Sequence, residues 1–529
     1  MDIKSQIVAN KWRLLLLGFA ITYVLIILPN LTKTPIQWDE ISHLNSGSML
    51  YMGKYSDFVH NAFYPPLFDV ITCAFFKIFG ISLFTARLPA VLFAVLSLWA
   101  VFEIAYYMYN GKIALLSAIM LGIMPGFFWL STYAMLETIL IFFVTISLLF
   151  FYKWLTTRQD RMLLLSGVAL GLGFLAKYQT PVIAGLIMIC SIILFARKTL
   201  KANFKKLAIG ITTAVLVIVP WVIIAYQVYK SEFLGQWLYV LQEGNPGRSV
   251  YSTRFPLPIF YFIEMIWPHP DFHPISILCY ILGLAGLAYM AYKHRHQDKF
   301  ILLWFAVVYI FFTIVSNKDW RYVTPLFPAI AIAASTLIVA IGEKIQNEWK
   351  KPRTNTIKKH LVKITSIVLI ATIAGTMIYS VQDSYSFTTK SYINIDIKSA
   401  TSYACNHLEE GKSIMVLFPF NNFNKDMVQF FLWAEDDRDT TVLQYPMQAV
   451  DAYVPNFDLD EFTEQCRQNN VQYIMFSEYG GATTPYYKTT LNLQQIYEQL
   501  HSSENFTEVK REQTFGDEPR RIFVISFTG

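Results

Sequence analysis

Two adjacent carboxylates, Asp39 and Glu40, follow the first long apolar run of the chain. Aromatic and apolar residues dominate the stretch after them, so we expect the pair to lie against apolar surface. A carboxylate in such surroundings can have a raised pKa and act as a general base. The alternative is a solvated acidic surface, which is the default for adjacent acids in a loop.

Glu137 opens one later apolar run, and Lys177 ends the next. An ionisable group at a membrane boundary is a candidate for function, and a cation there can bind a phosphate. The structural alternatives are an acid favoured at a helix N-terminus and a lysine that extends its ammonium to the interface. Gly171 and Gly173 would let helices pack closely beside Lys177.

A short polar stretch between two late apolar runs carries Lys318, Arg321 and Tyr322. The two cations lie on the side of the membrane where the distribution of positive charge predicts few of them. An anionic lipid phosphate would explain their presence. Asp319 could instead pair with one of them.

His269, Asp271 and His273 form the fourth candidate group, with prolines between them. Their side chains are of the type that binds a divalent metal, but the prolines do not give a usual ligand geometry. Structural or acceptor-binding contacts are the favoured interpretation. We predict no firm cofactor, and a divalent metal stays open.

The elements that must position these residues are membrane helices. The chain is 54% hydrophobic and 15% charged, whereas soluble domains carry about 25% charged residues. A bilayer core needs roughly 20 apolar residues per helix, and we predict about eleven such spans. They cover residues 14–30, 84–108, 113–131, 137–155, 161–176, 180–196, 206–226, 274–292, 300–316, 322–342 and 361–381. Residues 65–80 begin with two prolines and contain two charges, and we predict a helix along the membrane surface there.

The short basic loops agree with this topology. With this span count they all lie on the side of the N-terminus, where Lys4, Lys11 and Arg13 precede the first span. We therefore expect an integral plasma-membrane protein with a cytoplasmic N-terminus. The positive charge is explained by topology, and no basic patch interleaved with aromatics points to a nucleic acid.

Three regions are then expected to face outward: residues 31–83, 227–273 and everything after 381. We predict a transmembrane domain over residues 1–381 and a small extracytoplasmic α/β domain over 382–529. Apolar stretches at 413–418, 471–476 and 521–527 predict strands, and 458–469 and 491–500 predict helices. A disulfide between Cys405 and Cys466 is open in this domain.

Taken in order, these features resemble the GT-C glycosyltransferases, nearest to the protein O-mannosyltransferases and the bacterial aminoarabinose transferases. The resemblance covers roughly residues 1–345, and the C-terminal domain is similar only in placement. The stretches that carry it, besides the acidic pair, are Tyr64-Pro65-Pro66, Ala86-Arg87-Leu88-Pro89, Met135-Leu136-Glu137-Thr138, Gly171–Lys177 and Arg321-Tyr322-Val323-Thr324-Pro325.

The resemblance implies a sugar donor on polyprenyl phosphate, either undecaprenyl or dolichyl, and a lipid, glycan or protein acceptor. It implies that Asp39 is the catalytic residue, with Glu40 supporting or replacing it, and that Glu137 is the second acidic residue of the site. Positions that bind donor phosphate or line the cavity in that family correspond here to Lys177, Lys318, Arg321, Tyr322 and Tyr64. Aminoarabinose transferases carry a phosphate-contacting lysine where Tyr64 stands, so that substrate is not assumed.

The expected function is inverting transfer of one sugar to an acceptor hydroxyl on the outer face of the membrane. Three alternatives stay open. A metal-dependent oligosaccharyltransferase would use the histidine and aspartate group. A transporter would carry internal repeats and mid-span breaks, which the sequence does not display. A non-catalytic membrane subunit would not need the acids.

Overall fold

The computed structural model divides the chain into two compact units. The first comprises Met1–Asn30, Val59–Phe68 and Pro89–Thr389, and the second Leu31–Phe58, Asp69–Leu88 and Lys390–Gly529. The structure describes residues 3–61, 65–195, 197–230, 257–267, 273–315, 318–351, 356–389, 396–420, 423–435, 440–447, 452–453, 456–477, 487–488, 492–513 and 521–529.

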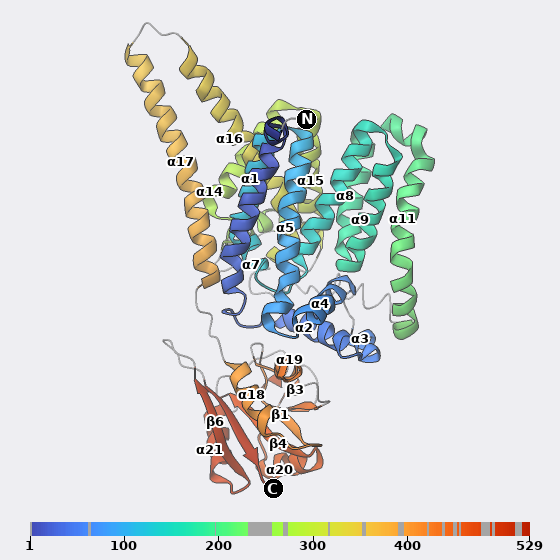
Figure 1. Cartoon of the computed structure of the whole chain (residues 1–529), viewed down its shortest axis with the longest axis vertical. Coiled ribbons are helices and arrows are strands. Elements are labelled where there is room, and N and C mark those ends of the chain that lie inside the picture. Colours follow the sequence, from blue (N-terminus) through green and yellow to red (C-terminus); the bar gives the residue numbers. More distant parts are fainter. Residues whose placement is uncertain are drawn as a thin grey trace. The chain divides into compact units, whose positions relative to one another are not determined.

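The first unit is helical throughout its described residues (Figure 1). Its helices are α1 (Ile3–Ile27), η1 (Leu28–Asn30), most of α5 (Leu83–Met108), α6 (Gly111–Gly122), α7 (Pro125–Leu130), α8 (Glu137–Thr157), α9 (Asp160–Ala176), α10 (Gln179–Phe195), α11 (Arg197–Tyr229), α13 (Leu257–Glu264), α14 (Ile277–Lys293), α15 (His296–Ile314), η3 (Trp320–Leu326), α16 (Phe327–Lys350) and α17 (Thr356–Thr389).

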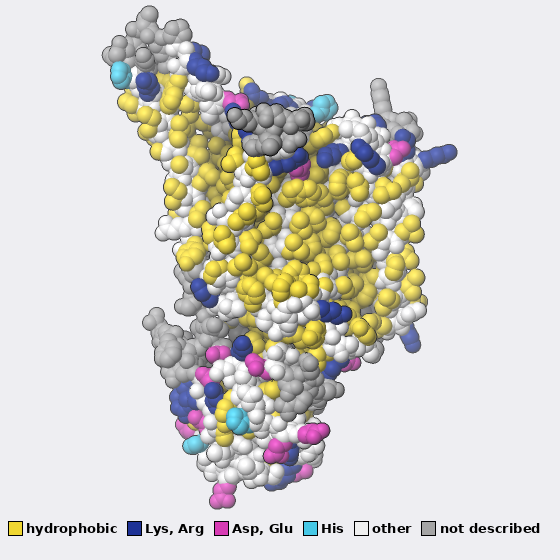
Figure 2. All heavy atoms as spheres, in the orientation of Figure 1, with side chains coloured by type: hydrophobic (Ala, Val, Ile, Leu, Met, Phe, Trp, Pro, Cys, Tyr) yellow, Lys and Arg dark blue, Asp and Glu magenta, His cyan; other side chains and the backbone are white. Residues whose placement is uncertain are grey.

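Length and composition identify these helices as membrane spans. Within the described residues, seven helical segments are long and apolar enough to cross a bilayer, and three shorter apolar helices accompany them. Figure 2 shows a broad band of hydrophobic side chains over this unit, with Lys and Arg gathered along its margin. Apolar side chains exposed in this way are stable in lipid and not in water. The chain is therefore an integral membrane protein.

Each span predicted from the sequence coincides with a helix, but residues 113–131 do not form one continuous helix. The chain leaves α6 at Gly122, adopts an extended backbone at Met124 and starts α7 at Pro125. A proline lacks the N–H that a helix interior requires and disfavours helical geometry in the residue before it. The apolar run predicted as one span is therefore divided between two helices.

Glycines set the closest helix contacts of the first unit. A Cβ on Gly167 of α9 would lie 2.3 Å from the carbonyl oxygen of Gly210 on α11. A Cβ on Gly286 of α14 would lie 2.2 Å from the carbonyl oxygen of Ala333 on α16. Small residues at such positions allow helix backbones to approach closely, which supplies the van der Waals contact that stabilises helix pairs in lipid.

The second unit begins with the helices of the first loop, α2 (Trp38–Tyr51), α3 (Tyr55–Asn61) and α4 (Leu67–Phe79), the last two of which cross the unit boundary. At 1.5 Å per residue, the 13 residues of α4 extend about 20 Å. That length is short of a bilayer core of about 30 Å. The structure therefore confirms a short helix where the sequence predicted one.

The C-terminal part of the second unit is an α/β domain. Its elements are α18 (Ile397–His407), β1 (Ser413–Leu417), α19 (Lys425–Glu435), β2 (Val442–Tyr445), β3 (Ala452–Tyr453), α20 (Leu459–Gln468), β4 (Val471–Ser477), β5 (Tyr487–Lys488), α21 (Leu493–Ser502), β6 (Phe506–Gln513) and β7 (Arg521–Phe527). The main sheet has the order β2-β1-β4-β7-β6, with β2, β1 and β4 parallel and the last two strands antiparallel.

This domain confirms the three strands and two helices predicted from its sequence. Strands β1 and β4 are apolar almost throughout because both faces of a parallel sheet are covered. Cys405 and Cys466 are both buried and both free, so the disulfide left open by the sequence is not formed. Cys466 belongs instead to the apolar core beside Phe462 and Ile474.

Candidate active site

Helix α2 carries the acidic pair, and its own first turn fixes where it begins. Gln37 has an extended backbone and precedes the helix as its N-cap. The backbone N–H of Gln37 donates to Oε2 of Glu40 at 3.2 Å, and the Gln37 side chain accepts from the N–H of Glu40. This reciprocal capping box satisfies N–H groups that have no partner inside the helix. Glu40 is therefore part of the helix start.

Glu40 is also one half of a fully buried ion pair. Arg87, in the second turn of α5, donates from Nε to Oε1 and from Nη2 to Oε2 of Glu40, each at 2.7 Å. Both side chains are 0% exposed. A bidentate guanidinium–carboxylate pair of this kind is strong and directional. Both oxygens of Glu40 are thus occupied.

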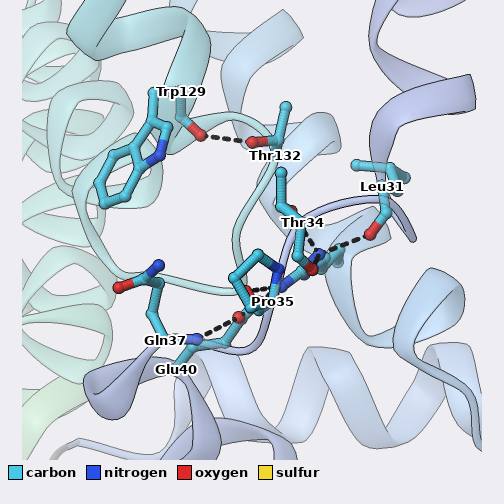
Figure 3. Close-up of polar contacts among 8 residues, drawn as sticks. Leu31, Thr34, Pro35, Gln37, Glu40, Trp129 and Thr132 are labelled. Carbon is cyan, nitrogen blue, oxygen red and sulfur yellow. Dashed lines mark hydrogen bonds and ion pairs between the residues drawn. The ribbon is translucent and has the colours of Figure 1, made fainter. Parts of the chain in front are cut away.

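The same guanidinium of Arg87 also donates hydrogen bonds to the loop that precedes α2. Its Nη1 donates to the carbonyl oxygens of Leu31 at 2.6 Å and Thr34 at 3.1 Å, and to Oγ1 of Thr34 at 2.9 Å. Its Nη2 donates to the carbonyl oxygen of Pro35 at 3.1 Å. Figure 3 shows Leu31, Thr34, Pro35 and Glu40 converging on this point. The loop entering α2 is therefore fixed at residues 31–40.

Asp39 differs from its neighbour in surroundings. It is half-buried, whereas Glu40 is completely enclosed. Adjacent residues on an α-helix point about 100° apart, so Asp39 lies off the face that Arg87 holds. The structure thus separates the two acids into an enclosed, structural carboxylate and a more accessible one. This separation favours Asp39 over Glu40 as the reactive acid.

A buried histidine–aspartate pair joins α2 to α4. Nδ1 of His43 lies 2.9 Å from Oδ1 of Asp69, and both side chains are almost inaccessible to solvent. Burial raises the pKa of Asp69, and the charge and hydrogen bond of His43 oppose that shift. The helices approach closely beside this pair, since a Cβ on Gly47 would lie 2.8 Å from Cγ2 of Thr72. The sequence interpretation did not identify this pair.

Glu137 and Lys177 form an ion pair in the first unit. Nζ of Lys177 donates to Oε1 of Glu137 at 2.8 Å, and the two side chains are 12% and 6% exposed. Glu137 opens α8, and Lys177 follows the last residue of α9. The second carboxylate oxygen of Glu137 is buried and has no hydrogen-bond partner. Glu137 lies in the first turn of α8, the position that its structural alternative described, and Lys177 pairs with it instead of extending into solvent.

The glycines before Lys177 pack closely against neighbouring helices, as predicted. A Cβ on Gly171 would lie 2.6 Å from Cβ of Val217 on α11. A Cβ on Gly173 would lie 2.3 Å from Cγ2 of Thr180 on α10. These contacts fix the end of α9 from two sides and hence the position from which Lys177 extends.

The polar stretch before α16 is internally paired. Asp319 binds the Arg321 guanidinium through both oxygens at 2.8–3.2 Å and also caps η3 by accepting from the backbone N–H of Arg321 at 2.8 Å. Tyr322 stacks on Phe312 with ring centroids 6.2 Å apart. The pairing with Asp319 that the sequence left open is therefore present.

Lys318 closes the C-terminal end of α15. Its ammonium donates to the carbonyl oxygens of Phe312, Thr313 and Val315, which are among the helix-end acceptors that lack partners within the helix. Burial lowers the pKa of Lys318 to about 8, which leaves it predominantly charged at neutral pH. All three N–H donors of this ammonium are engaged.

Glu264, at the end of α13, is a buried acid that the sequence interpretation missed. It is 5% exposed. Burial, and secondarily the negative charge of Asp319, raise the pKa of Glu264 to about 8. The signal in the sequence was an acid inside an otherwise apolar stretch, Leu257–Met265. Such a position favours a protonated carboxyl group near neutral pH.

The predicted metal group is only partly within the structure. His273 donates from Nδ1 to the carbonyl oxygen of Ile266. His269, Asp271 and Tyr64 lie outside the described residues. Among the residues that are described, no three His, Cys, Asp or Glu side chains are close enough to hold a metal ion.

Residues 64–224 match the family model described as dolichyl-phosphate-mannose-protein mannosyltransferase. The chain is 25% identical over 366 residues to undecaprenyl phosphate-alpha-4-amino-4-deoxy-L-arabinose arabinosyl transferase 1 of Proteus mirabilis. That alignment covers 64% of this chain and 62% of the relative, so the chain spans less than two thirds of the relative's length.

Solved structures of two proteins share the architecture over most of the chain. ArnT from Cupriavidus metallidurans aligns with a TM-score of 0.62 in the apo state and 0.60 bound to undecaprenyl phosphate, at 13% identity, over 98% of both chains. The oligosaccharyltransferase AglB from Archaeoglobus fulgidus aligns with a TM-score of 0.58 at 12% identity, over 89% of this chain and 70% of AglB. The chain has the GT-C fold, as the sequence resemblance predicted.

Proposed function

We propose that this protein transfers a single sugar from a polyprenyl-phosphate carrier to an acceptor hydroxyl on the outer face of the membrane, with inversion at the anomeric carbon. The observation that carries the proposal is the division of the acidic pair. Arg87 encloses Glu40 and fixes the loop, while Asp39 stays accessible on the same helix. A base must be positioned rigidly and still be reachable, and Asp39 meets both conditions.

In the proposed reaction, Asp39 accepts the proton of the acceptor hydroxyl as its oxygen attacks the anomeric carbon. The new C–O bond forms while the bond from that carbon to the phosphate oxygen breaks, and polyprenyl phosphate leaves. The transition state has oxocarbenium character, as in other glycosyl transfer. A positioned base contributes roughly 10²–10⁴-fold in rate. Stabilisation of the departing phosphate supplies much of the remainder.

Lys177 is our first candidate for stabilising that phosphate. Its ammonium has three N–H donors, and the hydrogen bond to Glu137 uses one of them. The hydrogen bond to Glu137 fixes the direction in which the ammonium points. Lys318 is a weaker candidate than the sequence suggested, because three backbone carbonyls already bind it. Arg321 would have to exchange Asp319 for the phosphate.

The nature of the donor rests on the relatives. The Proteus mirabilis relative is named for transfer from undecaprenyl phosphate, and ArnT has been solved with that lipid bound. The positive charge in the loops on the side of the N-terminus supports a cytoplasmic N-terminus, which would place the C-terminal domain outside. Tyr64 occupies the position of a phosphate-contacting lysine in aminoarabinose transferases, so we leave the sugar unassigned.

The likeness to AglB supports one second candidate, a metal-dependent oligosaccharyltransferase. The two candidates differ in donor and in metal requirement. Mass spectrometry of polyprenyl-phosphate sugars and of surface glycans, in cells with and without the protein, separates them. Single-sugar transfer requires one polyprenyl-phosphate monosaccharide to accumulate and one glycan to lose a single residue. Accumulation of a lipid-linked oligosaccharide, with activity abolished by a chelator, would favour the second candidate.

A further inference from the structure

Helix α2 is held by the C-terminal domain as well as by Arg87. Within the second unit, α2 and α19 are in contact (Figure 1). Nδ2 of Asn45 donates to the backbone carbonyl oxygen of Asp426 at 3.0 Å. Just after the C-terminal end of α2, in the connection to α3, the ammonium of Lys54 lies over the ring of Trp433, 5.5 Å from its centroid. Two polar contacts thus tie α2 and the residues that directly follow it to a helix of the α/β domain.

The N-terminal end of α19, which accepts the hydrogen bond from Asn45, is itself fixed by a helix cap. Oδ1 of Asn424 accepts from the backbone N–H groups of Asp426 at 3.0 Å and Met427 at 3.1 Å, which caps the helix. Asn424 and Met427 are completely buried, and Trp433 is 6% exposed. Helix α19 packs against strand β2 and helix α18 of the same domain. Contacts made to α19 are therefore contacts to a folded body.

The contacts occupy different faces of α2. With 3.6 residues per turn, Glu40 points about 100° and Asn45 about 240° round the helix from Asp39. Arg87 holds the first of these faces and α19 holds the second. Asp39 lies between them on the third. A helix held on two faces cannot rotate about its axis, and rotation is the motion that would redirect Asp39.

We propose that the C-terminal α/β domain is a positioning element of the active site. Helix α19 fixes the rotation of α2 about its own axis and thereby the direction in which the Asp39 carboxylate points. The inference rests on the proposed function and deepens it, because it assigns the domain to the same site. Asn45 and Lys54 act through Asp39 and are positioning residues. Displacement of a reacting group by about 1 Å can lower a rate by about 10²-fold.

Two substitutions test the proposal in the full chain, reconstituted in lipid nanodiscs. Asn45→Asp keeps the shape of the side chain and replaces the N–H donor by an acceptor facing the Asp426 carbonyl oxygen. Lys54→Met keeps the apolar stem and removes the cation, whereas Lys54→Arg keeps a cation over Trp433. Lys54 is half-buried, so its variants are expected to fold. Lys398→Met makes the same charge change at an exposed position of α18 in the same domain.

The probe is the polyprenyl-phosphate-sugar fraction extracted from cells that lack the protein, with glycan acceptor from the same cells. We expect Asn45→Asp and Lys54→Met to lower kcat about 10–100-fold with the donor KM unchanged. Lys54→Arg should recover most of the rate, and Lys398→Met should match the wild type. Hydrogen exchange, read by mass spectrometry, should quicken at α2 amides in the two impaired variants.

Wild-type kcat in both Asn45→Asp and Lys54→Met would overturn the proposal, whether or not exchange at α2 quickens. A rise in donor KM with unchanged kcat would also overturn it, since that pattern indicates lost substrate binding. Asp39→Asn is measured beside them. If Asp39→Asn is inactive while the α19-contact variants are normal, the positioning inference alone fails. If Asp39→Asn retains full turnover, the assigned base fails as well.

Discussion

The buried pair between Glu40 and Arg87 allows a quantitative test of how the loop is held. We expect Arg87→Met to lower the free energy of unfolding by about 3–5 kcal/mol, because it leaves the Glu40 carboxylate buried without its partner. The same change removes donors to the carbonyl oxygens of Leu31, Thr34 and Pro35. Turnover should fall too, since the start of α2 loses its anchor.

Arg13 provides a matched control. It binds Glu103 through two nitrogens at 2.9 and 3.2 Å, but its side chain is 53% exposed. An exposed pair contributes about 1 kcal/mol or less. Arg13→Met should therefore change stability little, although the substitution and the bond geometry are alike. The comparison separates burial from the mere presence of an ion pair.

The double variant Glu40→Gln with Arg87→Met tests whether the stability lost in Arg87→Met comes from the unpaired Glu40 carboxylate. Replacing both charges removes the unpaired buried ion, so it should be more stable than Arg87→Met alone. Unfolding is followed by tryptophan fluorescence in mixed detergent micelles of increasing denaturing content. The reasoning is refuted if Arg87→Met lies within about 0.5 kcal/mol of the wild type, a change typical of ordinary surface substitutions. The reasoning is also refuted if the double variant loses as much stability as the single variants Glu40→Gln and Arg87→Met lose together.

Three other outcomes are expected. Lys177→Met should lower kcat at least about 10-fold, the smallest effect we expect from losing an electrostatic stabiliser of the leaving phosphate. The control Lys206→Met breaks an ion pair whose side chains are 42% and 47% exposed, and it should leave kcat unchanged. Equal kcat in the two variants would exclude Lys177 from the reaction. Glu264 has a pKa raised to about 8 by burial, so its contribution to stability is full below its unfolded pKa and is lost as pH rises through 8. Glu264→Gln should accordingly raise the Tm relative to the wild type at pH 9 and leave it unchanged at pH 4; a gain that does not depend on pH would contradict the shift. Gly286→Leu should lower the yield of folded protein, because its Cβ would lie 2.2 Å from the backbone oxygen of Ala333; Gly185→Leu, which meets nothing within 4 Å, should be tolerated in size-exclusion profiles, and equal profiles would contradict the packing argument.

Hydropathy alone located the helices because the bilayer requires long apolar segments whose backbone bonds are satisfied internally. The same reasoning failed at Pro125, where a local backbone constraint interrupts an apolar run. Strands β1, β4 and β7 of the C-terminal domain were predictable because their apolar runs are short and lie between polar turns. What composition cannot give is how these elements pair in space.

The candidate site was predictable to a similar extent as the fold. The acids and cations were identified by type and position, but their partners were not. Arg87 lies 47 residues from Glu40 in the chain, and only tertiary structure brings them together. His43 and Asp69 are 26 residues apart on two different helices. Arg321 and Asp319 are neighbours, and that pairing alone was open to prediction.

The fold also changes how the cations are interpreted. Lys318 was placed outside the membrane against the charge bias, which suggested a ligand phosphate. Its ammonium instead binds the carbonyl end of α15. A helix end supplies the negative partial charge that the sequence interpretation sought in a ligand. Position relative to a helix terminus is thus as informative as topology.

The most direct test of the account is turnover of Asp39→Asn in reconstituted vesicles, with the extracted polyprenyl-phosphate-sugar fraction and its acceptor. The exposed acid Asp57 of α3 provides the matched control, Asp57→Asn. We expect Asp39→Asn to lose at least about 100-fold in kcat while it stays folded and in the membrane, and Asp57→Asn to match the wild type. Wild-type turnover in folded Asp39→Asn would contradict the assignment of Asp39 as the base.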